Sequence, residues 1–216
     1  MMVAENILKI KQEIGQKVEL VVVSKYRHFE EIQKAYDAGI RHFAENRVQA
    51  LLERKTQLPS DIQWHIIGHL QTNKVKHIVP FIAMIQSVDS LKLLQEINKQ
   101  AAYNQRNIKC LLQVFIASED TKFGLTETEL FELLNNPIFQ SMQNIQICGL
   151  MGMASNTDNI PQVKQELTHL KNIFDRVKKE FTLPEFNTLS MGMSSDYQIA
   201  IECGSNMIRI GSRVFE

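Results

Sequence analysis

Short apolar runs alternate with helical patterns along the whole chain, and this alternation constrains the fold more than any other feature. Eight runs have the length of strands, at residues 19–25, 40–44, 62–67, 81–85, 108–116, 145–150, 186–189 and 207–210. Apolar residues three and four apart predict helices between them, most clearly at residues 3–14, 91–101 and 163–177. Strands that alternate with helices in this way are typical of a parallel sheet covered by helices.

The predicted fold class is α/β, a single (β/α)₈ TIM-type barrel that forms one domain over residues 1–216. No linker rich in proline, glycine or serine and no block of like charge divides the chain. Such barrels typically need ~250 residues, so this shorter chain is expected to have short loops. The alternative is a doubly wound open sheet, which usually carries a glycine fingerprint after its first strand. Residues 24–27, which follow the first apolar run, contain no glycine.

Composition argues against several classes of protein. The 24 basic and 24 acidic side chains give zero net charge, which does not favour a general nucleic-acid binder or a membrane-surface protein. Three widely spaced cysteines without a CxxC pair indicate neither a disulfide framework nor a zinc site. The N-terminal residues lack the apolar core of a signal peptide, and no apolar run is long enough to span a bilayer. We therefore expect a cytoplasmic protein with no metal, nucleic-acid or membrane partner.

Lys25 lies at the end of the first predicted strand. On a strand its side chain points the same way as Val21 and Val23, so it should emerge at the rim of the core. In one interpretation the side chain extends from the strand end into water. In the other its amine lies in a partly dry pocket, where it is neutral often enough to form an imine with an aldehyde.

The last two apolar runs are each followed by small residues, hydroxyl groups and free N–H groups. These residues are Ser190, Met191, Gly192, Ser194 and Ser195 after the seventh run, and Gly211 and Ser212 after the eighth. In (β/α)₈ barrels phosphate often binds at these two places, and a serine that caps the following helix would help to hold it. Either loop alone is equally consistent with a simple turn. Because a closed barrel places its eighth strand beside its first, both loops are expected near Lys25.

Two further polar residues are candidates for the site. Arg209 lies between two isoleucines of the last predicted strand and points opposite to both, and an arginine inside a barrel needs an acceptor. That acceptor is either a carboxylate in a structural ion pair, Glu45 or Glu202, or a ligand such as an aromatic ring nitrogen or an anion. Asn46 follows the second run and serves either as a helix N-cap or as a hydrogen-bond partner of a ligand.

Six segments of the sequence together resemble the pyridoxal phosphate homeostasis proteins. They are residues 23–26, 43–46, 64–74, 149–151, 189–194 and 209–212. The resemblance covers nearly the whole chain in order, and the third and fifth of these segments are highly specific. It implies a barrel of the alanine racemase N-terminal domain kind that carries pyridoxal 5′-phosphate (PLP) as an internal aldimine, a Schiff base, on Lys25.

The same resemblance implies roles for the other candidates. Residues 190–194, with Gly211 and Ser212, match the phosphate loops. Arg209 matches the arginine near the pyridine nitrogen, and Asn46 matches a residue of the pocket. The resemblance assigns no catalytic residue and no metal ligand.

The chain departs from the family pattern at three places. Ala44 stands where the family usually has glycine, so the turn before Asn46 is expected to differ slightly. Phe115 stands where an asparagine is common in the fifth strand, which leaves no polar ligand contact at that position. The chain ends at residues 214–216, where the family usually continues with Phe-Gly and a few further residues.

The resemblance implies a role in PLP homeostasis, in which the protein holds, buffers or delivers this vitamin B6 cofactor without turning over a substrate. We expect a monomer, and PLP-dependent apo-enzymes as the recipients of the cofactor. The alternatives are a PLP-dependent amino-acid racemase and a cofactor-free scaffold or RNA-binding protein. Alanine racemase brings a catalytic tyrosine from an added β domain, for which no chain remains after residue 216. An arginine at the pyridine nitrogen also disfavours protonation of the ring, which is then a poorer electron sink. RNA binding is disfavoured because no basic stripe stands out.

Overall fold

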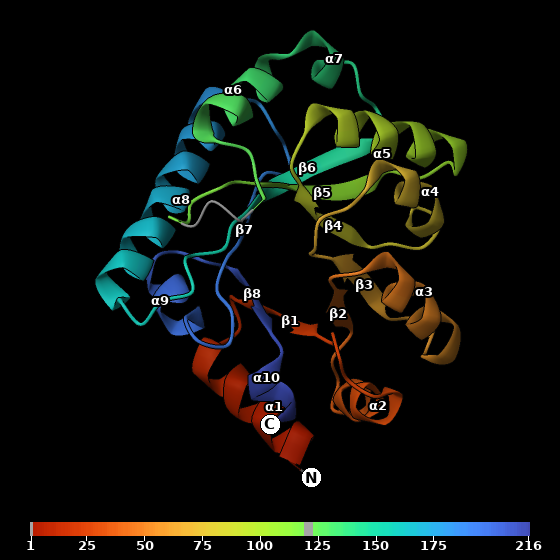
Figure 1. Ribbon diagram of the computed structural model, residues 1–216, viewed down its shortest axis with the longest axis vertical. Coiled ribbons are helices and arrows are strands. Elements are labelled where there is room, and N and C mark those ends of the chain that lie inside the picture. The colour runs from red at the N-terminus through yellow and green to blue at the C-terminus, as the bar shows by residue number, and fades with distance from the viewer. Residues whose placement is uncertain (1, 119–122) are drawn as a thin grey trace.

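The computed structural model describes residues 2–118 and 123–216, in which eight parallel strands close into a barrel (Figure 1). The strands follow one another around the barrel in chain order, and β8 pairs with β1 to close it. They are β1 (Glu19–Val23), β2 (His42–Glu45), β3 (Gln63–Ile66), β4 (Met84–Val88), β5 (Ile108–Gln113), β6 (Ile145–Met151), β7 (Thr188–Ser190) and β8 (Met207–Ile210). The prediction of a (β/α)₈ barrel is confirmed, and the open doubly wound sheet is excluded.

Helices surround the barrel, and the first and last of them lie together at its outside (Figure 1). An amide N–H donor of Asn6 in α1 bonds the carbonyl oxygen of Val214 in α10 at 3.2 Å, so the two chain ends meet beside the junction of β1 and β8. The helices are α1 (Met2–Ile14), α2 (Phe29–Asp37), α3 (Val48–Gln57), α4 (Val75–Ile78) after the 3-10 turn η1 (Thr72–Lys74), α5 (Leu91–Tyr103), α6 (Glu127–Asn135), α7 (Pro137–Gln140), α8 (Ile160–Glu180), α9 (Tyr197–Glu202) and α10 (Ser212–Phe215).

Alternate side chains of the strands point outward to the helices or inward to the barrel axis. The outward side chains and the apolar stripes of the helices form one large buried cluster. A smaller cluster fills the barrel interior, and it consists of Val21, Val23, Ala44, Met84, Leu111, Cys148, Met151 and Met207. Several of these interior residues are long and unbranched, and methionine adapts its shape to an irregular space. The interior therefore supports the floor of whatever lies at the open end of the barrel.

Two predicted strand positions are wrong in detail, and so is the N-cap expected at Asp89 for the helix over residues 91–101. The fourth strand is Met84–Val88 instead of residues 81–85, because the apolar residues before it pack as a loop while two polar residues continue the strand. The fifth strand ends at Gln113, three residues early. Helix α5 is capped by the hydroxyl of Ser90 and not by Asp89.

Among the described residues, no helix combines the length and the apolar character needed to cross a membrane.

Candidate functional site

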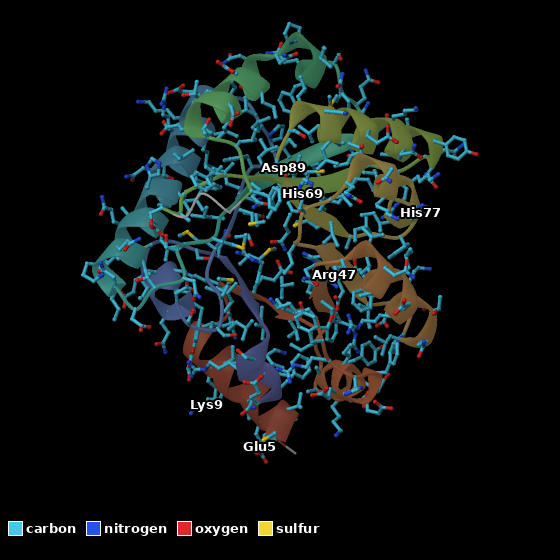
Figure 2. All side chains as sticks on the ribbon, viewed as in Figure 1. Glu5, Lys9, Arg47, His69, His77 and Asp89 are labelled. Carbon is cyan, nitrogen blue, oxygen red and sulfur yellow. The ribbon has the colours of Figure 1, made fainter. Side chains whose placement is uncertain are left out.

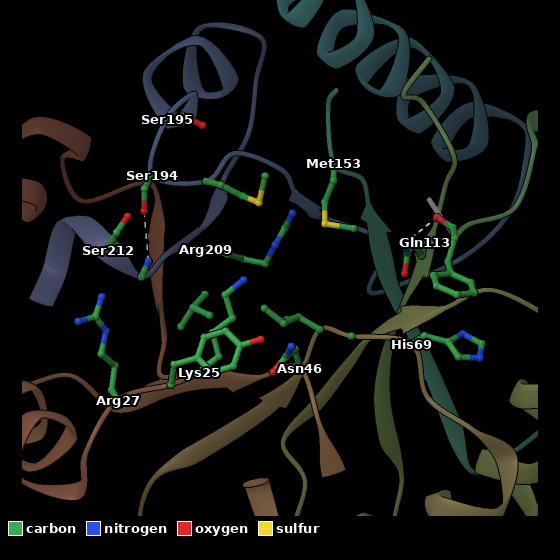
Figure 3. A pocket seen from close by; sticks show the side chains of 17 residues that line it. Lys25, Arg27, Asn46, His69, Gln113, Met153, Ser194, Ser195, Arg209 and Ser212 are labelled. Carbon is green, nitrogen blue, oxygen red and sulfur yellow. Dashed lines mark hydrogen bonds between the residues drawn. The ribbon is translucent and has the colours of Figure 1, made fainter. Parts of the chain in front are cut away.

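A cavity of about 550 Å³ opens at the carboxyl ends of the strands (Figure 3). Six expected site residues line it: Lys25, Asn46, Ser194, Arg209, Gly211 and Ser212. They come from the ends of β1, β2, β7 and β8 and from the loops that follow these strands. The barrel thus gathers side chains that are almost 190 residues apart in the sequence. The other three expected residues, Ser190, Met191 and Gly192, are buried behind the cavity wall.

Lys25 lies two residues beyond the strand that was expected to carry it. β1 ends at Val23, and the chain then turns through Lys25 and Tyr26, which adopts a left-handed φ of 64°. The Lys25 side chain is exposed and lines the cavity with Asn46 and Arg209 (Figure 3). The lysine is therefore presented by a tight turn at the rim of the barrel, rather than by the regular strand.

A buried carboxylate fixes the turn that carries Lys25. The hydroxyl of Ser24 donates to Glu45 Oε1 at 2.6 Å, and the guanidinium of Arg54 donates to the same oxygen. Arg54 Nη2 also donates to the carbonyl oxygen of Arg27 at 2.9 Å, so both sides of the lysine are held. Burial raises the pKa of Glu45, and the hydrogen bond from Ser24 and the charge of Arg54 oppose that rise. No pattern in the sequence predicts that Glu45 and Arg54 together hold this turn.

Arg209 is fully enclosed on β8 and uses neutral acceptors. Its Nη1 donates to Ser190 Oγ at 2.6 Å and its Nη2 donates to the carbonyl oxygen of Gly152 at 3.0 Å. The alternative of an ion pair with Glu45 or Glu202 is wrong. Burial lowers the pKa of Arg209 to about 10, so the guanidinium remains charged at neutral pH. A cation that is held by neutral groups keeps most of its charge available to a ligand in the cavity.

A chain of buried hydrogen bonds continues from Arg209 into the barrel. Ser190 Oγ donates to Gln86 Oε1 at 2.7 Å, and Gln86 Nε2 donates to His65 Nδ1 at 2.8 Å. His65 Nε2 lies 3.1 Å from Nδ1 of His42. Burial lowers the pKa of His65 to about 3, with smaller contributions from nearby positive charge, so its ring is neutral. Since Nδ1 accepts from the amide, the proton of His65 must sit on Nε2.

The loops after β7 and β8 meet at one side of the cavity (Figure 3). The backbone N–H of Gly211 points to Ser194 Oγ at 3.4 Å, which places two hydroxyls and an N–H group close together with Ser212. Gly192 has a φ of +98°, and a Cβ there would lie 2.7 Å from a side-chain carbon of α9. The expectation that Ser194 or Ser195 caps the next helix is wrong, because α9 starts after Asp196 and has no side-chain cap.

Asn46 faces the cavity and does not cap a helix. Helix α3 begins at Val48, one residue later than a cap by Asn46 would require. The backbone of Asn46 lies against Gly68, where a Cβ would approach the carbonyl oxygen of Asn46 to 2.2 Å. Ala44, the residue that departs from the family pattern, is buried in β2 with ordinary extended neighbours and needs no left-handed backbone.

Several residues that line the cavity were not expected from the sequence. His69 Nδ1 lies 2.9 Å from Asp89 Oδ2, and the His69 ring stacks on Phe123 with centroids 4.3 Å apart. Gln113, at the end of β5, also lines the cavity and donates to the carbonyl oxygen of Phe123 at 2.7 Å. Phe115 is not among the lining residues, so the polar side chain that this strand contributes is Gln113. A lone glutamine at the end of an apolar run was the one available signal.

Comparison with known proteins places this geometry in a family. The model of the alanine racemase N-terminal domain matches residues 2–215. A protein of Pasteurella multocida named pyridoxal phosphate homeostasis protein is 32% identical over 228 residues, which cover 100% of this chain and 97% of that protein. The chain belongs to the pyridoxal phosphate homeostasis protein family. A Helicobacter pylori protein of the same name is 36% identical over 201 residues, 92% of this chain and 87% of that protein.

Solved structures agree with this assignment. PipY of Synechococcus elongatus without PLP matches with a TM-score of 0.92 and 32% identity, over 99% of this chain and 100% of that chain. PipY with PLP bound matches with a TM-score of 0.90 and 31% identity over the same shares. An alanine racemase of Clostridium difficile has a TM-score of 0.78 at 16% identity, over 99% of this chain and 59% of that chain. At that identity the likeness concerns the fold alone.

Proposed function

We propose that this protein binds PLP in the cavity at the open end of the barrel and acts in PLP homeostasis, holding, buffering or delivering the cofactor without turning over a substrate. One observation carries the proposal: an amine, a buried guanidinium and a set of hydroxyl and N–H donors face one cavity, from Lys25, Arg209, Ser194, Gly211 and Ser212. The name of the curated relatives and the PLP bound to PipY support the same cofactor.

The cavity fits the cofactor in size and in chemistry. Its volume of about 550 Å³ lies within the range of roughly 300–1,000 Å³ that small-molecule sites occupy. The donors of Ser194, Gly211 and Ser212 suit a phosphate group, which needs several N–H or O–H donors and no carboxylate beside it. Ser190 and Gly192 support this loop from behind the wall. We therefore assign phosphate binding to the three lining residues and a supporting role to the two buried ones.

PLP supplies an aldehyde that reacts with amines, and the protein supplies the amine and the surroundings. Lys25 provides that amine from a turn held by Glu45 and Arg54. Arg209 would donate a hydrogen bond to the pyridine nitrogen and oppose its protonation, because a permanent cation beside a ring nitrogen disfavours a second positive charge. Asn46 would offer its amide to the cofactor from the loop after β2. These roles bind and orient the cofactor without a proton relay to a substrate.

The recipients of the cofactor are proposed to be PLP-dependent apo-enzymes, and the protein is proposed to be a cytoplasmic monomer of one domain.

The racemase alternative needs two acid/base groups, one on each face of the substrate carbon. Lys25 is one candidate, and His69, which contacts Asp89 and also lines the cavity, is a second. Incubation with L-alanine and other L-amino acids, followed by chiral chromatography, tests this alternative. D-isomer formation that depends on Lys25 would replace the carrier function by an enzymatic one.

The decisive experiment on the carrier function is covalent mapping of the cofactor. Purified protein is loaded with PLP, reduced with borohydride and digested, and the phosphopyridoxyl group is located by mass spectrometry. We expect the label on Lys25, with loss of the visible absorption band. Lys74 and Lys76 are exposed lysines in the segment after β3 and serve as internal controls. A label confined to either of them would refute the assignment of Lys25.

A further inference from the structure

A second cavity opens beside the cofactor cavity, between α3 and the segment that leads into α4. It has a volume of about 390 Å³ and shares Asn46 and His69 with the first cavity. Its other lining residues are Arg47, Val48, Gln49, Leu52, Gln71, Lys74 and His77. Three of these, Gln71, Lys74 and His77, lie in or just after the sequence block 64–74 and do not line the cofactor cavity. The second cavity therefore needs an account of its own.

The lining of the second cavity is basic and contains no carboxylate. Arg47, Lys74 and His77 are exposed around it, and the rest of the lining is apolar or carries amide and imidazole groups. Figure 2 shows Arg47 and His77 on the same side of the barrel, beside α3 and α4. The chain as a whole has zero net charge, so this gathering of cations is local. Such a lining attracts anions.

Arg47 differs from the other arginines of the described chain. The others are held by carboxylates, by backbone carbonyls, by a serine hydroxyl or by aromatic rings. Across residues 2–118 and 123–216, the side chain of Arg47 forms no hydrogen bond, ion pair or ring contact. The side chains of Lys74 and His77 are also without an acidic partner over those residues. Two cationic side chains and one imidazole at one cavity are thus available to a ligand.

We propose that the second cavity binds a small oxyanion, the phosphate or carboxylate group of a small molecule. Arg47 is the principal donor, because a planar guanidinium can hold an oxyanion through two parallel hydrogen bonds. Lys74 supplies a second positive charge, and His77 supplies a ring N–H donor. The volume lies near the lower end of the range for small-molecule sites, which favours a small metabolite. Because Asn46 and His69 line both cavities, the bound anion lies at the mouth of the cofactor cavity. This inference does not rest on the proposed function.

The test is a titration of the full chain with inorganic phosphate, followed by the amide signals in NMR spectra. Val48 and Gln49 report on the second cavity, and Gly211 and Ser212 report on the cofactor cavity in the same samples. We expect saturable shifts at Val48 and Gln49. A parallel titration with succinate tells whether the site prefers phosphate or carboxylate. Shifts confined to Gly211 and Ser212 would overturn the second site and leave the proposed PLP site intact. Shifts at Val48 and Gln49 without shifts at Gly211 and Ser212 would support the second site and count only against the proposed phosphate loops.

Two charge-matched variants make the test specific. Arg47→Met removes the principal donor, and Lys9→Met removes one exposed positive charge from α1, far from the cavity (Figure 2). We expect Arg47→Met to raise the dissociation constant of the preferred anion at Val48 at least tenfold, and Lys9→Met to leave it within twofold. Equal effects of the two variants would reduce the observation to general charge attraction and refute a built site. Amide spectra of both variants establish that the fold is retained.

Discussion

His65 makes the stability of this barrel depend on pH in a way that can be calculated. The side chain is 2% exposed, and burial lowers its pKa from the ordinary 6.5 to about 3. Between these two values the unfolded chain binds a proton that the folded chain does not bind. The contribution of neutral His65 is therefore fully present above pH 6.5 and is lost as the pH falls towards 3.

The expected loss is about 1.4 kcal/mol for each pH unit below 6.5. Acidification from pH 7 to pH 4.5 should thus remove about 3 kcal/mol of unfolding free energy through this one side chain, a large share of the 5–15 kcal/mol that is typical of folded domains. His42 and Lys109 contribute in the same direction, because positive charge near the ring opposes its protonation.

The assay is urea unfolding at half-unit steps between pH 4.5 and 8, for the natural protein and for His65→Gln. The variant carries an amide that does not titrate, so the difference between the two stability curves isolates the histidine from all other groups. We expect the difference to be constant above pH 7 and to shrink steadily below 6.5. His77→Gln, which removes an exposed histidine, is the matched control and should leave the slope unchanged. Parallel curves for the natural protein and His65→Gln would refute the reasoning.

Three further outcomes follow from the site. Ser194→Ala combined with Ser212→Ala should weaken PLP binding far more than pyridoxal binding, because charge-assisted bonds to phosphate are worth roughly 1.5–3 kcal/mol each; fluorescence titration of both ligands measures this, and an equal loss would place the phosphate elsewhere. Gln86→Met should lower the unfolding free energy by about 2–4 kcal/mol, since it leaves the Ser190 hydroxyl proton without its acceptor and the buried Nδ1 of His65 without its donor, and denaturant melts check the value. Lys25→Ala should lose the borohydride-stable label but retain weak PLP binding by dialysis, because the phosphate donors remain.

The sequence determined the barrel and the order of its parts. The eighth strand is found at Met207–Ile210 as predicted, and the helix of residues 163–177 lies inside α8, because periods of two and of 3.6 residues are local properties of the chain. Closure followed from the same pattern, and with it the meeting of Lys25, Gly211 and Ser212 at neighbouring strand ends. The capping box of Thr126 and Glu129 at the start of α6 is another structure that depends only on residues close in the sequence.

Only the tertiary structure decided how the polar groups are partnered. Arg209 donates to Ser190 and to a backbone carbonyl, and to neither Glu45 nor Glu202. Glu45 instead accepts from Arg54, which helps to hold the turn that carries Lys25. Gln86 directly follows the predicted fourth strand. It bonds both His65 and Ser190, which is 104 residues away in the sequence. A buried donor takes whichever acceptor the packed barrel brings within about 3 Å, and that distance depends on the closed register of all eight strands and not on any local pattern.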